Sequence, residues 1–361
     1  MRKVFIALMM VVVLAMASAP AFAAKYKKEY KLDIVPSLNT GWGMGAAYFA
    51  DLVRERSNGR INIKVYPNSQ LTTGKQTNAF MLLRNGTIDF AVQSTINYSP
   101  QIPELNLFAL PFFIAGEPNR YKAMDAILDG EGGKLIAQAI EKKGGKFIAF
   151  GENGFRELTN SKKEIRKPSD LVGMKIRVVG SPLFIDIFKA LGANPQAMAW
   201  SDTMSAIQQG VIDGQENPVN TFYPLRVTDY HKYITNWHYM ADPTLFVVNP
   251  GVWKSFDKAD QEIIIKAAKE AGQYQKALAR IGLDENDKAG ANMAYLKKLN
   301  RVPEVTDWYT KLRGEGVTMT DLTPAETKEF VEKTKGVINQ WESKIGKKLI
   351  ETARADMAKV R

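Results

Sequence analysis

Apolar and polar positions in the first third of the chain follow alternating strand and helix periods. Segments with a period of two predict strands, and segments with a 3.6-residue spacing predict helices. In chain order the expected elements are strand 30–35, helix 45–58, strand 59–66, helix 75–84 and strand 88–93. This β-α-β-α-β order predicts a mostly parallel sheet with right-handed crossovers.

The same patterns return after Gly144-Gly145, where a second unit is expected to begin. Its expected strands are 147–150, 175–179 and 212–217, and its expected helices are 182–191 and 202–209. Two such units in tandem predict an α/β protein with two lobes and a ligand cleft between them. Ligands of open α/β sheets bind beyond the carboxyl ends of the strands.

Long amphipathic helices are expected in the last third of the chain, over 258–300 and 324–359. We expect them to brace the lobes from outside. We therefore divide the chain into a first lobe (24–152 plus about 242–281) and a second lobe with the bracing helices (153–241 plus about 282–361).

The first 23 residues predict a secretory signal peptide. Met1 to Lys3 form a short basic start, 4–16 are almost uniformly apolar, and small residues up to Ala23 fit a cleavage site. The apolar run is too short to cross a bilayer core of about 30 Å as a helix. There is no cysteine to carry a lipid, so we expect a soluble protein of the periplasm.

Composition excludes several function classes. The absence of cysteine excludes a disulfide framework and thiol catalysis. The formal net charge is +11, but the basic residues are interspersed with acids and follow no nucleic-acid motif, so no nucleic-acid partner is expected. The positive excess is either a weak field that favours an anionic solute or ordinary solvated surface.

The sequence contains no recognisable catalytic or metal-binding motif. Its two histidines, His231 and His238, belong to no metalloprotease or hydrolase pattern. Gly74-Lys75 begins like the end of a phosphate-binding loop, but Gln76 breaks the pattern. We expect no enzyme activity, no cofactor and no metal site.

The segment 41–46 has the form G-x-G-x-x-A, which is typical of dinucleotide-binding turns. Trp42 and Met44 are bulky for a pyrophosphate cradle, and the next strand ends without an acidic residue for a ribose. We interpret the segment instead as a helix start whose amides face the cleft, where they can receive an anionic or hydroxyl group.

Arg177 is the strongest local candidate for ligand binding. On the strand 175–179 it points to the opposite face from Ile176 and Val178. A buried arginine needs a partner because its desolvation costs several kcal/mol, and its planar fork matches a carboxylate. Local sequence leaves two partners open, a neighbouring acid or a ligand. The polar run at 213–217 is similarly either part of a binding site or a capped turn.

Several long motifs occur in an order typical of one family. They are S-N-G-R-I-N-I-K-V-Y-P-N-S-Q-L (57–71), N-L-F-A-L-P-F-F (106–113), N-G-F-R-E-L-T-N (153–160), L-V-G-M-K-I-R-V (171–178) and I-Q-Q-G-V-I-D-G-Q-E-N-P (207–218). With these motifs the chain resembles the periplasmic solute-binding proteins of tripartite ATP-independent (TRAP) transporters, in the branch of dicarboxylate and sialic acid binders. The resemblance implies two lobes that close on an organic acid and deliver it to a sodium-coupled membrane permease.

The resemblance also implies roles for single residues. Arg177 would pair with the ligand carboxylate, and Arg156 and Asn217 would lie around the same group. Gln93 stands where sialic acid binders carry Glu, which argues against a sialic acid ligand.

Aromatic residues near the expected site suggest the ligand class. Trp200 stands where Phe is common in the family, Trp42 follows the first strand, and Phe222 and Tyr223 follow the polar run. They favour an apolar or aromatic monocarboxylate, with a C4-dicarboxylate or a sugar acid next. Two other function classes remain open: a ligand-sensing domain that feeds a signalling partner, and an exported α/β enzyme that acts on an acidic substrate.

Overall fold

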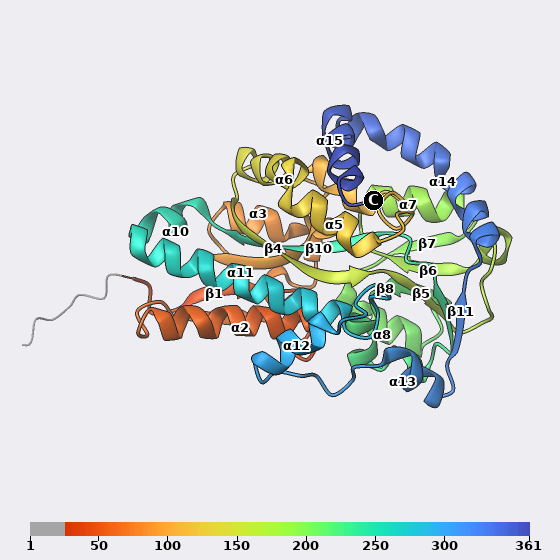
Figure 1. Ribbon diagram of the computed structural model, residues 1–361, viewed down its shortest axis with the longest axis horizontal. Helices are drawn as coiled ribbons and strands as arrows, with labels where there is room; N and C mark the ends of the chain where they lie inside the picture. The colour runs from red at the N-terminus through yellow and green to blue at the C-terminus, as the bar shows by residue number, and fades with distance from the viewer. Residues whose placement is uncertain (1–25) are drawn as a thin grey trace, which may run out of the picture.

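Two β-sheets lie side by side along the long axis of the molecule, with helices packed on both (Figure 1). The computed structural model describes residues 26–361, and the predicted signal peptide at 1–23 lies outside the described residues. Within the described residues, no helix is long and apolar enough to cross a membrane. We call the unit built on the five-stranded sheet lobe I and the unit built on the six-stranded sheet lobe II.

The sheet of lobe I has the strand order β2-β1-β3-β10-β4. Its strands are β1 (Tyr30–Asp33), β2 (Ile63–Tyr66), β3 (Phe90–Ser94), β4 (Lys146–Phe155) and β10 (Ala241–Val248). β1 pairs in parallel with β2 and β3, as predicted. β10 arrives from far along the chain and runs antiparallel to β3 and β4. The interpretation of 147–150 as the start of the second unit is therefore wrong, because β4 pairs with β10 in the first sheet.

The sheet of lobe II has the order β11-β9-β5-β8-β6-β7. Its strands are β5 (Glu157–Asn160), β6 (Lys175–Val178), β7 (Asn194–Ala197), β8 (Gly214–Asn217), β9 (Tyr233–Asn236) and β11 (Thr318–Asp321). β6 runs parallel to β7 and β8, whereas β5 runs antiparallel to β8 and β9. Of these six strands the sequence predicted only β6 and β8.

Helices cover both sheets. Those of lobe I are α2 (Gly41–Arg56), α3 (Ala79–Arg84), α4 (Thr95–Tyr98), α5 (Arg120–Asp129) and α6 (Glu131–Lys142); those of lobe II are α7 (Pro182–Ala190), α8 (Trp200–Gln208) and α9 (Val219–Phe222). The helix predicted over 75–84 begins as a 3-10 turn, η2 (Gln76–Asn78), before α3. A longer 3-10 segment, η3 (Pro103–Ala109), follows α4.

Glycines divide the long C-terminal helices. The helices after β10 are α10 (Pro250–Ser255), α11 (Lys258–Arg280), α12 (Ala291–Lys298), α13 (Trp308–Gly314), α14 (Pro324–Ile345) and α15 (Lys347–Ala358). The single helix predicted over 258–300 is broken between Gly282 and Gly290, which both have positive φ. Gly346, at φ 103°, separates α14 from α15 in the same way. Positive φ is strained for other residues, so a helix ends readily at such a glycine.

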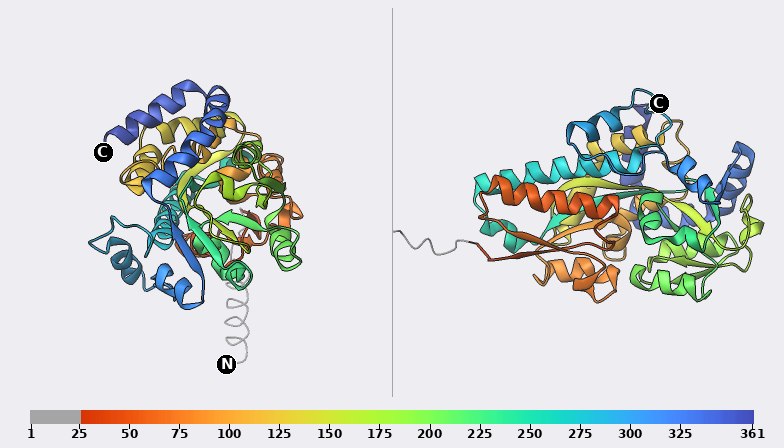
Figure 2. Two further views of the ribbon diagram at one scale, coloured as in Figure 1. Left: turned by 90° about the vertical axis from the view of Figure 1, so that its right-hand side faces the viewer. Right: turned by 90° about the horizontal axis from the view of Figure 1, so that it is seen from below.

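The C-terminal helices contact both lobes (Figure 2). α11 packs on α2 and β4, and α15 packs on α5 and α6. α14 packs on α7 of lobe II. These helices therefore lie outside the sheets and join the lobes, as expected of bracing helices. The exact division of the chain between the lobes stays a prediction.

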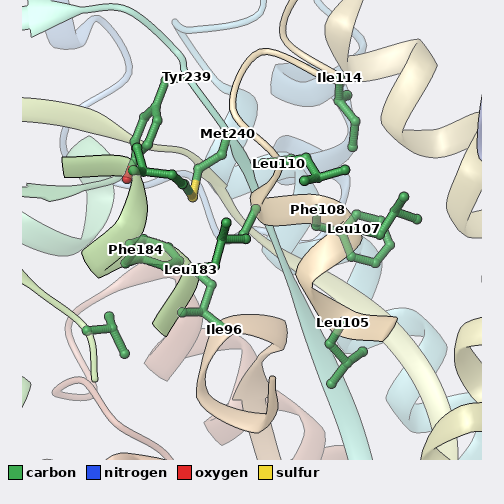
Figure 3. Packing of buried hydrophobic residues seen from close by; sticks show 14 of the residues in the cluster. Ile96, Leu105, Leu107, Phe108, Leu110, Ile114, Leu183, Phe184, Tyr239 and Met240 are labelled. Carbon is green, nitrogen blue, oxygen red and sulfur yellow. The ribbon is translucent and has the colours of Figure 1, made fainter. Parts of the chain in front are cut away.

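Apolar side chains from both lobes form one continuous cluster (Figure 3). Ile96 of α4 and Phe108 of η3 come from lobe I, whereas Leu183 and Phe184 come from α7 of lobe II; all four are at most 2% exposed. Burial of such side chains is the main favourable term in packing two elements together. The two lobes are thus held in contact by an apolar interface next to the polar site described below.

Candidate functional site

A cavity with about 300 Å³ of empty space lies between the two lobes. It is lined by Val35, Pro36, Trp42, Gln76, Ser94, Ile96, Asn97, Arg156, Arg177, Val179, Trp200, Asn217, Thr221 and Asp242. Five of the seven side chains predicted for ligand binding are among them: Arg177, Arg156, Asn217, Trp200 and Trp42. A space of this size, with a few polar groups among apolar ones, suits a small molecule.

Arg177 is held in place by a single carbonyl group. Its side chain is on β6 and only 1% exposed. Nε and Nη2 donate to the carbonyl oxygen of Met198 over 3.1 and 2.8 Å. The guanidinium carbon lies 5.3 Å from the centre of the Trp200 ring, within cation–π range. Two of the five N–H donors of a guanidinium are thereby used, and Nη1 has no hydrogen-bond partner among residues 26–361.

No carboxylate within the described residues forms an ion pair with Arg177, so of the two partners left open by the sequence the neighbouring acid is not present. Burial lowers the pKa of Arg177 to about 10, against a smaller opposing effect from the more distant Glu216. The side chain is still charged at neutral pH. A buried positive charge without a counter-ion in a cavity wall favours the entry of an anion.

Arg156 follows β4 and has the opposite environment. Its Nε and Nη2 donate to the Glu216 carboxylate, its Nη1 donates to Asp242 over 2.7 Å, and Nη2 also reaches the Glu216 carbonyl oxygen. Burial alone would lower the pKa of Arg156, but the Glu216 and Asp242 carboxylates raise it above its ordinary value. Two buried carboxylates thus neutralise this arginine.

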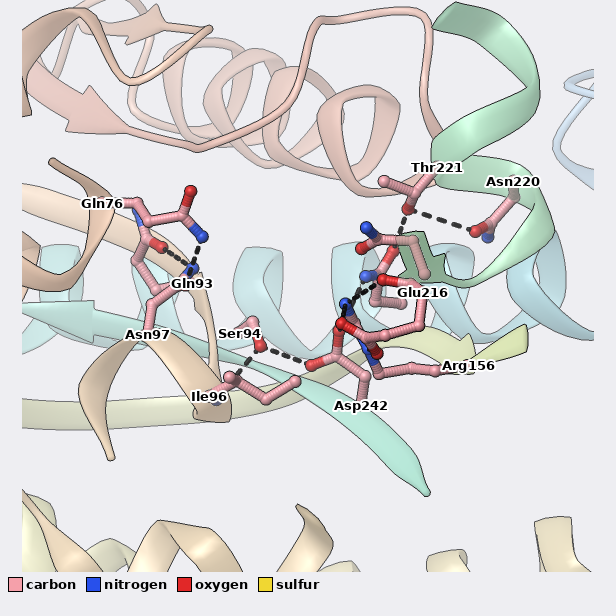
Figure 4. A network of polar contacts seen from close by, with 12 residues as sticks. Gln76, Gln93, Ser94, Ile96, Asn97, Arg156, Glu216, Asn220, Thr221 and Asp242 are labelled. Carbon is pink, nitrogen blue, oxygen red and sulfur yellow. Dashed lines mark hydrogen bonds and ion pairs between the residues drawn. The ribbon is translucent and has the colours of Figure 1, made fainter. Parts of the chain in front are cut away.

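The network around Arg156 extends through neighbouring side chains (Figure 4). Asp242 also accepts hydrogen bonds from the Ser94 hydroxyl and from Asn153. Thr221 donates to Asn153 over 2.6 Å. These contacts connect β3, β4 and β10 of lobe I with α9 of lobe II, so the network holds the two lobes together where the chain passes from one to the other.

Asn217 and Trp42 are oriented by local hydrogen bonds. Asn217, the last residue of β8, donates through Nδ2 to Gln215 over 2.8 Å. The indole Nε1 of Trp42 donates to the carbonyl oxygen of Val92 over 2.7 Å. Both side chains are at most 5% exposed. Their positions in the cavity wall are therefore fixed by the protein itself.

Gln93 and Phe222 do not line this cavity. Gln93 lies behind the wall, where it bonds to Asp33 and Asn97. Phe222 lines a separate cavity of about 380 Å³ together with Trp308 and other residues. A direct contact of either side chain with a ligand stays a prediction that this geometry does not favour.

Several polar lining residues were not predicted from the sequence. They are Gln76, Ser94, Asn97, Thr221 and Asp242. In the sequence, Gln76 stands out only as the residue that breaks a phosphate-loop pattern. Ser94 is the last residue of the buried strand β3, and Asn97 lies in α4 directly after it, at the carboxyl end where ligands of open sheets bind. That position was the available signal for these two residues.

The two histidines lie outside the cavity lining. His231 contacts the Thr159 hydroxyl through Nδ1, and burial lowers its pKa to about 4. His238 contacts the carboxylate of Glu157 and lines the second cavity. Neither is placed to act on a molecule between the lobes.

The glycines of segment 41–46 serve helix packing. A Cβ on Gly43 would lie 2.2 Å from the carbonyl oxygen of Ser37, and a Cβ on Gly45 would lie 2.1 Å from Gln275 of α11. The amide of Gly43 is capped by the Thr40 hydroxyl. Close approach of Ser37 and Gln275 therefore accounts for Gly43 of the G-x-G-x-x-A pattern and for Gly45, which lies at one of its variable positions.

Residues 33–294 match the family of bacterial extracellular solute-binding proteins, family 7. The chain belongs to this family. The similarity to solved structures confirms the predicted α/β two-lobed fold. The family consists of binding proteins, in agreement with the prediction that the chain is not an enzyme.

The relatives of this family 7 protein include TRAP solute-binding proteins of known structure and a periplasmic protein named for its ligand. A TRAP periplasmic solute-binding protein from Ralstonia eutropha H16, with bound (S)-2-acetolactate, is 48% identical over 92% of this chain and 100% of its own, with a TM-score of 0.84. One from Sulfurospirillum deleyianum, with bound succinate, is 30% identical over 91% of this chain and 98% of its own, with a TM-score of 0.75. The 2,3-diketo-L-gulonate-binding periplasmic protein YiaO of Escherichia coli is 33% identical over 65% of this chain and 70% of its own.

These likenesses confirm the resemblance to TRAP solute-binding proteins and the periplasmic location. The ligands named for the relatives are small acids that carry hydroxyl, oxo or second carboxyl groups. None of them supports the predicted preference for an apolar or aromatic acid.

Proposed function

We propose that this protein captures a small organic acid in the periplasm through Arg177 and delivers it to a TRAP permease. The observation that carries the proposal is a buried guanidinium that lines the inter-lobe cavity and has no carboxylate partner among the described residues. Its Nη1–Nη2 edge is free to give a carboxylate two parallel hydrogen bonds, which are the strongest that an arginine makes.

The charges in the cavity lining favour a single carboxylate. Arg177 and Arg156 are the cations of the lining, and Arg156 is already neutralised by Glu216 and Asp242. A dicarboxylate such as succinate would bring a second negative charge close to Asp242 without a second free cation. We therefore expect a monocarboxylate to bind more tightly than a C4-dicarboxylate.

The uncharged lining favours a hydroxy or oxo acid. Gln76, Asn97 and Asn217 present amides, and Ser94 and Thr221 present hydroxyls, beside the two tryptophans. Each of these groups already has a partner in the protein, but an unsubstituted aromatic acid would leave the second amide hydrogens of Gln76 and Asn97 unused, at a cost of at most about 1–3 kcal/mol for each. The aromatic walls expected from the sequence then pack against the carbon skeleton of a small, branched acid. Acetolactate, the ligand of the 48%-identical relative, has this chemistry.

Calorimetry with (S)-2-acetolactate, succinate, galactonate and benzoate tests this proposal. Arg177→Ala is expected to weaken binding of the best acid by roughly 2–5 kcal/mol, because one partner of a buried charge pair is removed. Arg226→Ala is the matched control, since Arg226 is an exposed arginine of the same lobe that pairs with Asp229. Unchanged affinity in Arg177→Ala would contradict the clamp, and tightest binding of benzoate would restore the aromatic preference.

Delivery to a sodium-coupled permease is the remaining part of the proposal. It is supported by membership in the family whose solved members are TRAP proteins. Uptake of the labelled acid into vesicles that contain the permease subunits should require both this protein and an inward sodium gradient. Uptake that persists after the gradient is collapsed would remove sodium from the proposal.

A further inference from the structure

Four side chains form a continuous hydrogen-bonded relay beside the cavity. Gln93 donates through Nε2 to Asp33 over 2.7 Å, and Asn97 donates through Nδ2 to the oxygen of Gln93 over 2.9 Å. Gln76 donates through Nε2 to the oxygen of Asn97 over 2.8 Å. All four residues belong to lobe I and are at most 5% exposed. Figure 4 shows the three amides grouped on one side of the site.

The relay ends in lobe II. The oxygen of Gln76 accepts a hydrogen bond from the backbone N–H of Trp200 over 2.8 Å. Trp200 is the first residue of α8, and the preceding Ala199 has no side chain that can cap the helix. The first N–H groups of a helix have no partner within the helix, so they need an acceptor from elsewhere. Gln76 supplies this acceptor from the opposite lobe.

The receiving segment also positions the clamp. Met198, two residues before Trp200, provides the carbonyl oxygen that holds Arg177. The Trp200 ring itself lies over the guanidinium of Arg177. The contact from Gln76 therefore fixes the segment against which Arg177 is oriented, and it forms only when the lobes are together.

The Trp200 end of the relay determines its direction. The Trp200 N–H can only donate, so each amide points its oxygen toward lobe II and its nitrogen toward Asp33, which accepts the last hydrogen bond. Gln76 and Asn97 each keep a second amide hydrogen, and both line the cavity. A ligand oxygen can use these hydrogens without breaking the relay.

We propose that Gln76 is an inter-lobe latch, which caps α8 when the lobes close and thereby sets how long the bound acid is held. This inference rests on the proposed function, because it adds a closing contact to the capture of an acid by Arg177. Beside this contact, a hydroxyl pair between Ser99 of lobe I and Ser181 of lobe II, at 3.2 Å, also crosses between the lobes. When the lobes separate, the Trp200 N–H and the Asn97 oxygen lose their buried partner and must be solvated again.

Stopped-flow dissociation of (S)-2-acetolactate from the full protein tests the latch. Gln76→Met keeps the length of the side chain but removes both hydrogen bonds, so we expect dissociation to be about 10-fold faster with little change in the association rate. Gln101→Met is the matched control, because Gln101 bonds to the Thr77 carbonyl oxygen within lobe I. Dissociation from Gln76→Met at the rate of this control would overturn the proposal.

A second variant separates a latch from a simple ligand contact. Gln93 does not line the cavity, so Gln93→Met can reach the ligand only through the relay. We expect dissociation to accelerate here too, about 3-fold, because Asn97 and Gln76 lose their fixed orientation. A Gln93→Met protein that is folded by circular dichroism and dissociates like the wild type would overturn the relay.

The outcome for Arg177→Ala distinguishes failure of this inference from failure of the proposed function. Lost affinity in Arg177→Ala with unchanged dissociation in Gln76→Met leaves the clamp in place and removes the latch. Unchanged affinity in Arg177→Ala removes the function on which the latch rests.

Discussion

Arg156 and Arg177 line the same cavity and are equally buried, yet their surroundings differ in kind. Arg156 is 2% exposed and bonds to Glu216 and Asp242, whereas Arg177 is 1% exposed and bonds to one carbonyl oxygen. Accordingly, the pKa of Arg156 is raised by its two carboxylates, and that of Arg177 is lowered by burial to about 10. Residue type and burial are the same, so the two arginines differ in their partners alone: Arg156 is paired with carboxylates of its own chain, and Arg177 has no carboxylate partner among the described residues.

A buried charge is costly unless it is paired, and the protein satisfies this requirement for Arg156 within its own chain. For Arg177 no carboxylate of the described residues does so. Under the proposed function, part of the binding energy of an anion would come from relieving this unfavourable burial. Three predictions test this contrast, in order of decreasing effect.

Removal of Arg156 should have the largest effect on stability. Arg156→Met leaves the Glu216 and Asp242 carboxylates buried without their counter-ion, and we expect the free energy of unfolding to fall by roughly 3–5 kcal/mol. Urea denaturation of the ligand-free protein measures it. Arg226→Ala, an exposed pair, should change stability by less than about 1 kcal/mol. If Arg156→Met lowered the free energy of unfolding by no more than Arg226→Ala does, the pairing of Arg156 with Glu216 and Asp242 would not stabilise the fold.

Removal of Arg177 should act in the opposite sense. Arg177→Met replaces an unpaired buried charge by an apolar side chain of similar length, while two hydrogen bonds to Met198 are lost. We expect the free energy of unfolding of the ligand-free protein to stay unchanged or to rise by up to about 2 kcal/mol. The same urea experiment compares the two arginines directly. A drop as large as that of Arg156→Met would make Arg177 a structural residue as well.

Much of the fold could be predicted from hydrophobic periodicity. The β1-α2-β2 order and the strands β6 and β8 follow long or clearly bounded patterns. All six strands of lobe II are only four residues long, and periodicity over so few positions identified β6 and β8 but missed β5, β7, β9 and β11. β10 was missed for a different reason: its place between β3 and β4 depends on a pairing across more than 80 residues of chain.

The site was predictable in its residue types but not in its pairing. The motifs singled out Arg156, Arg177 and Asn217, and all three line the cavity. Local sequence could not show that Glu216 pairs with Arg156 and not with Arg177. That choice depends on the register of β8 with β5 and β6. Gln76 was not recognisable either, since its partner is a backbone N–H in the other lobe.

The last prediction concerns Asp33, whose effect per pH unit is the smallest of the three. This carboxyl has the same kind of incomplete pairing as Arg177. It accepts one hydrogen bond, from Gln93, and its Oδ1 is buried without a partner in the described part of the chain. Burial raises the pKa of Asp33 to about 7, although the hydrogen bond from Gln93 acts to lower it. Asp33→Asn mimics the protonated form and still offers an oxygen to Gln93.

The sign of the pH dependence follows from the pKa of Asp33 in the folded and in the unfolded chain. In the unfolded chain Asp33 titrates near 3.8, so between that pH and about 7 the folded state retains a proton that the unfolded state has released. The contribution of Asp33 to the free energy of unfolding is therefore fully present below the unfolded pKa, falls as pH rises through this window, and levels off above it. The stability of Asp33→Asn relative to the wild type should rise with pH across the window, by at most about 1.4 kcal/mol per pH unit. Urea titrations at pH 4, 5.5, 7 and 8.5 measure this difference in the free energy of unfolding. A difference that does not depend on pH would mean that Asp33 is ionised in the folded protein throughout this range. The relay would then end on a full negative charge.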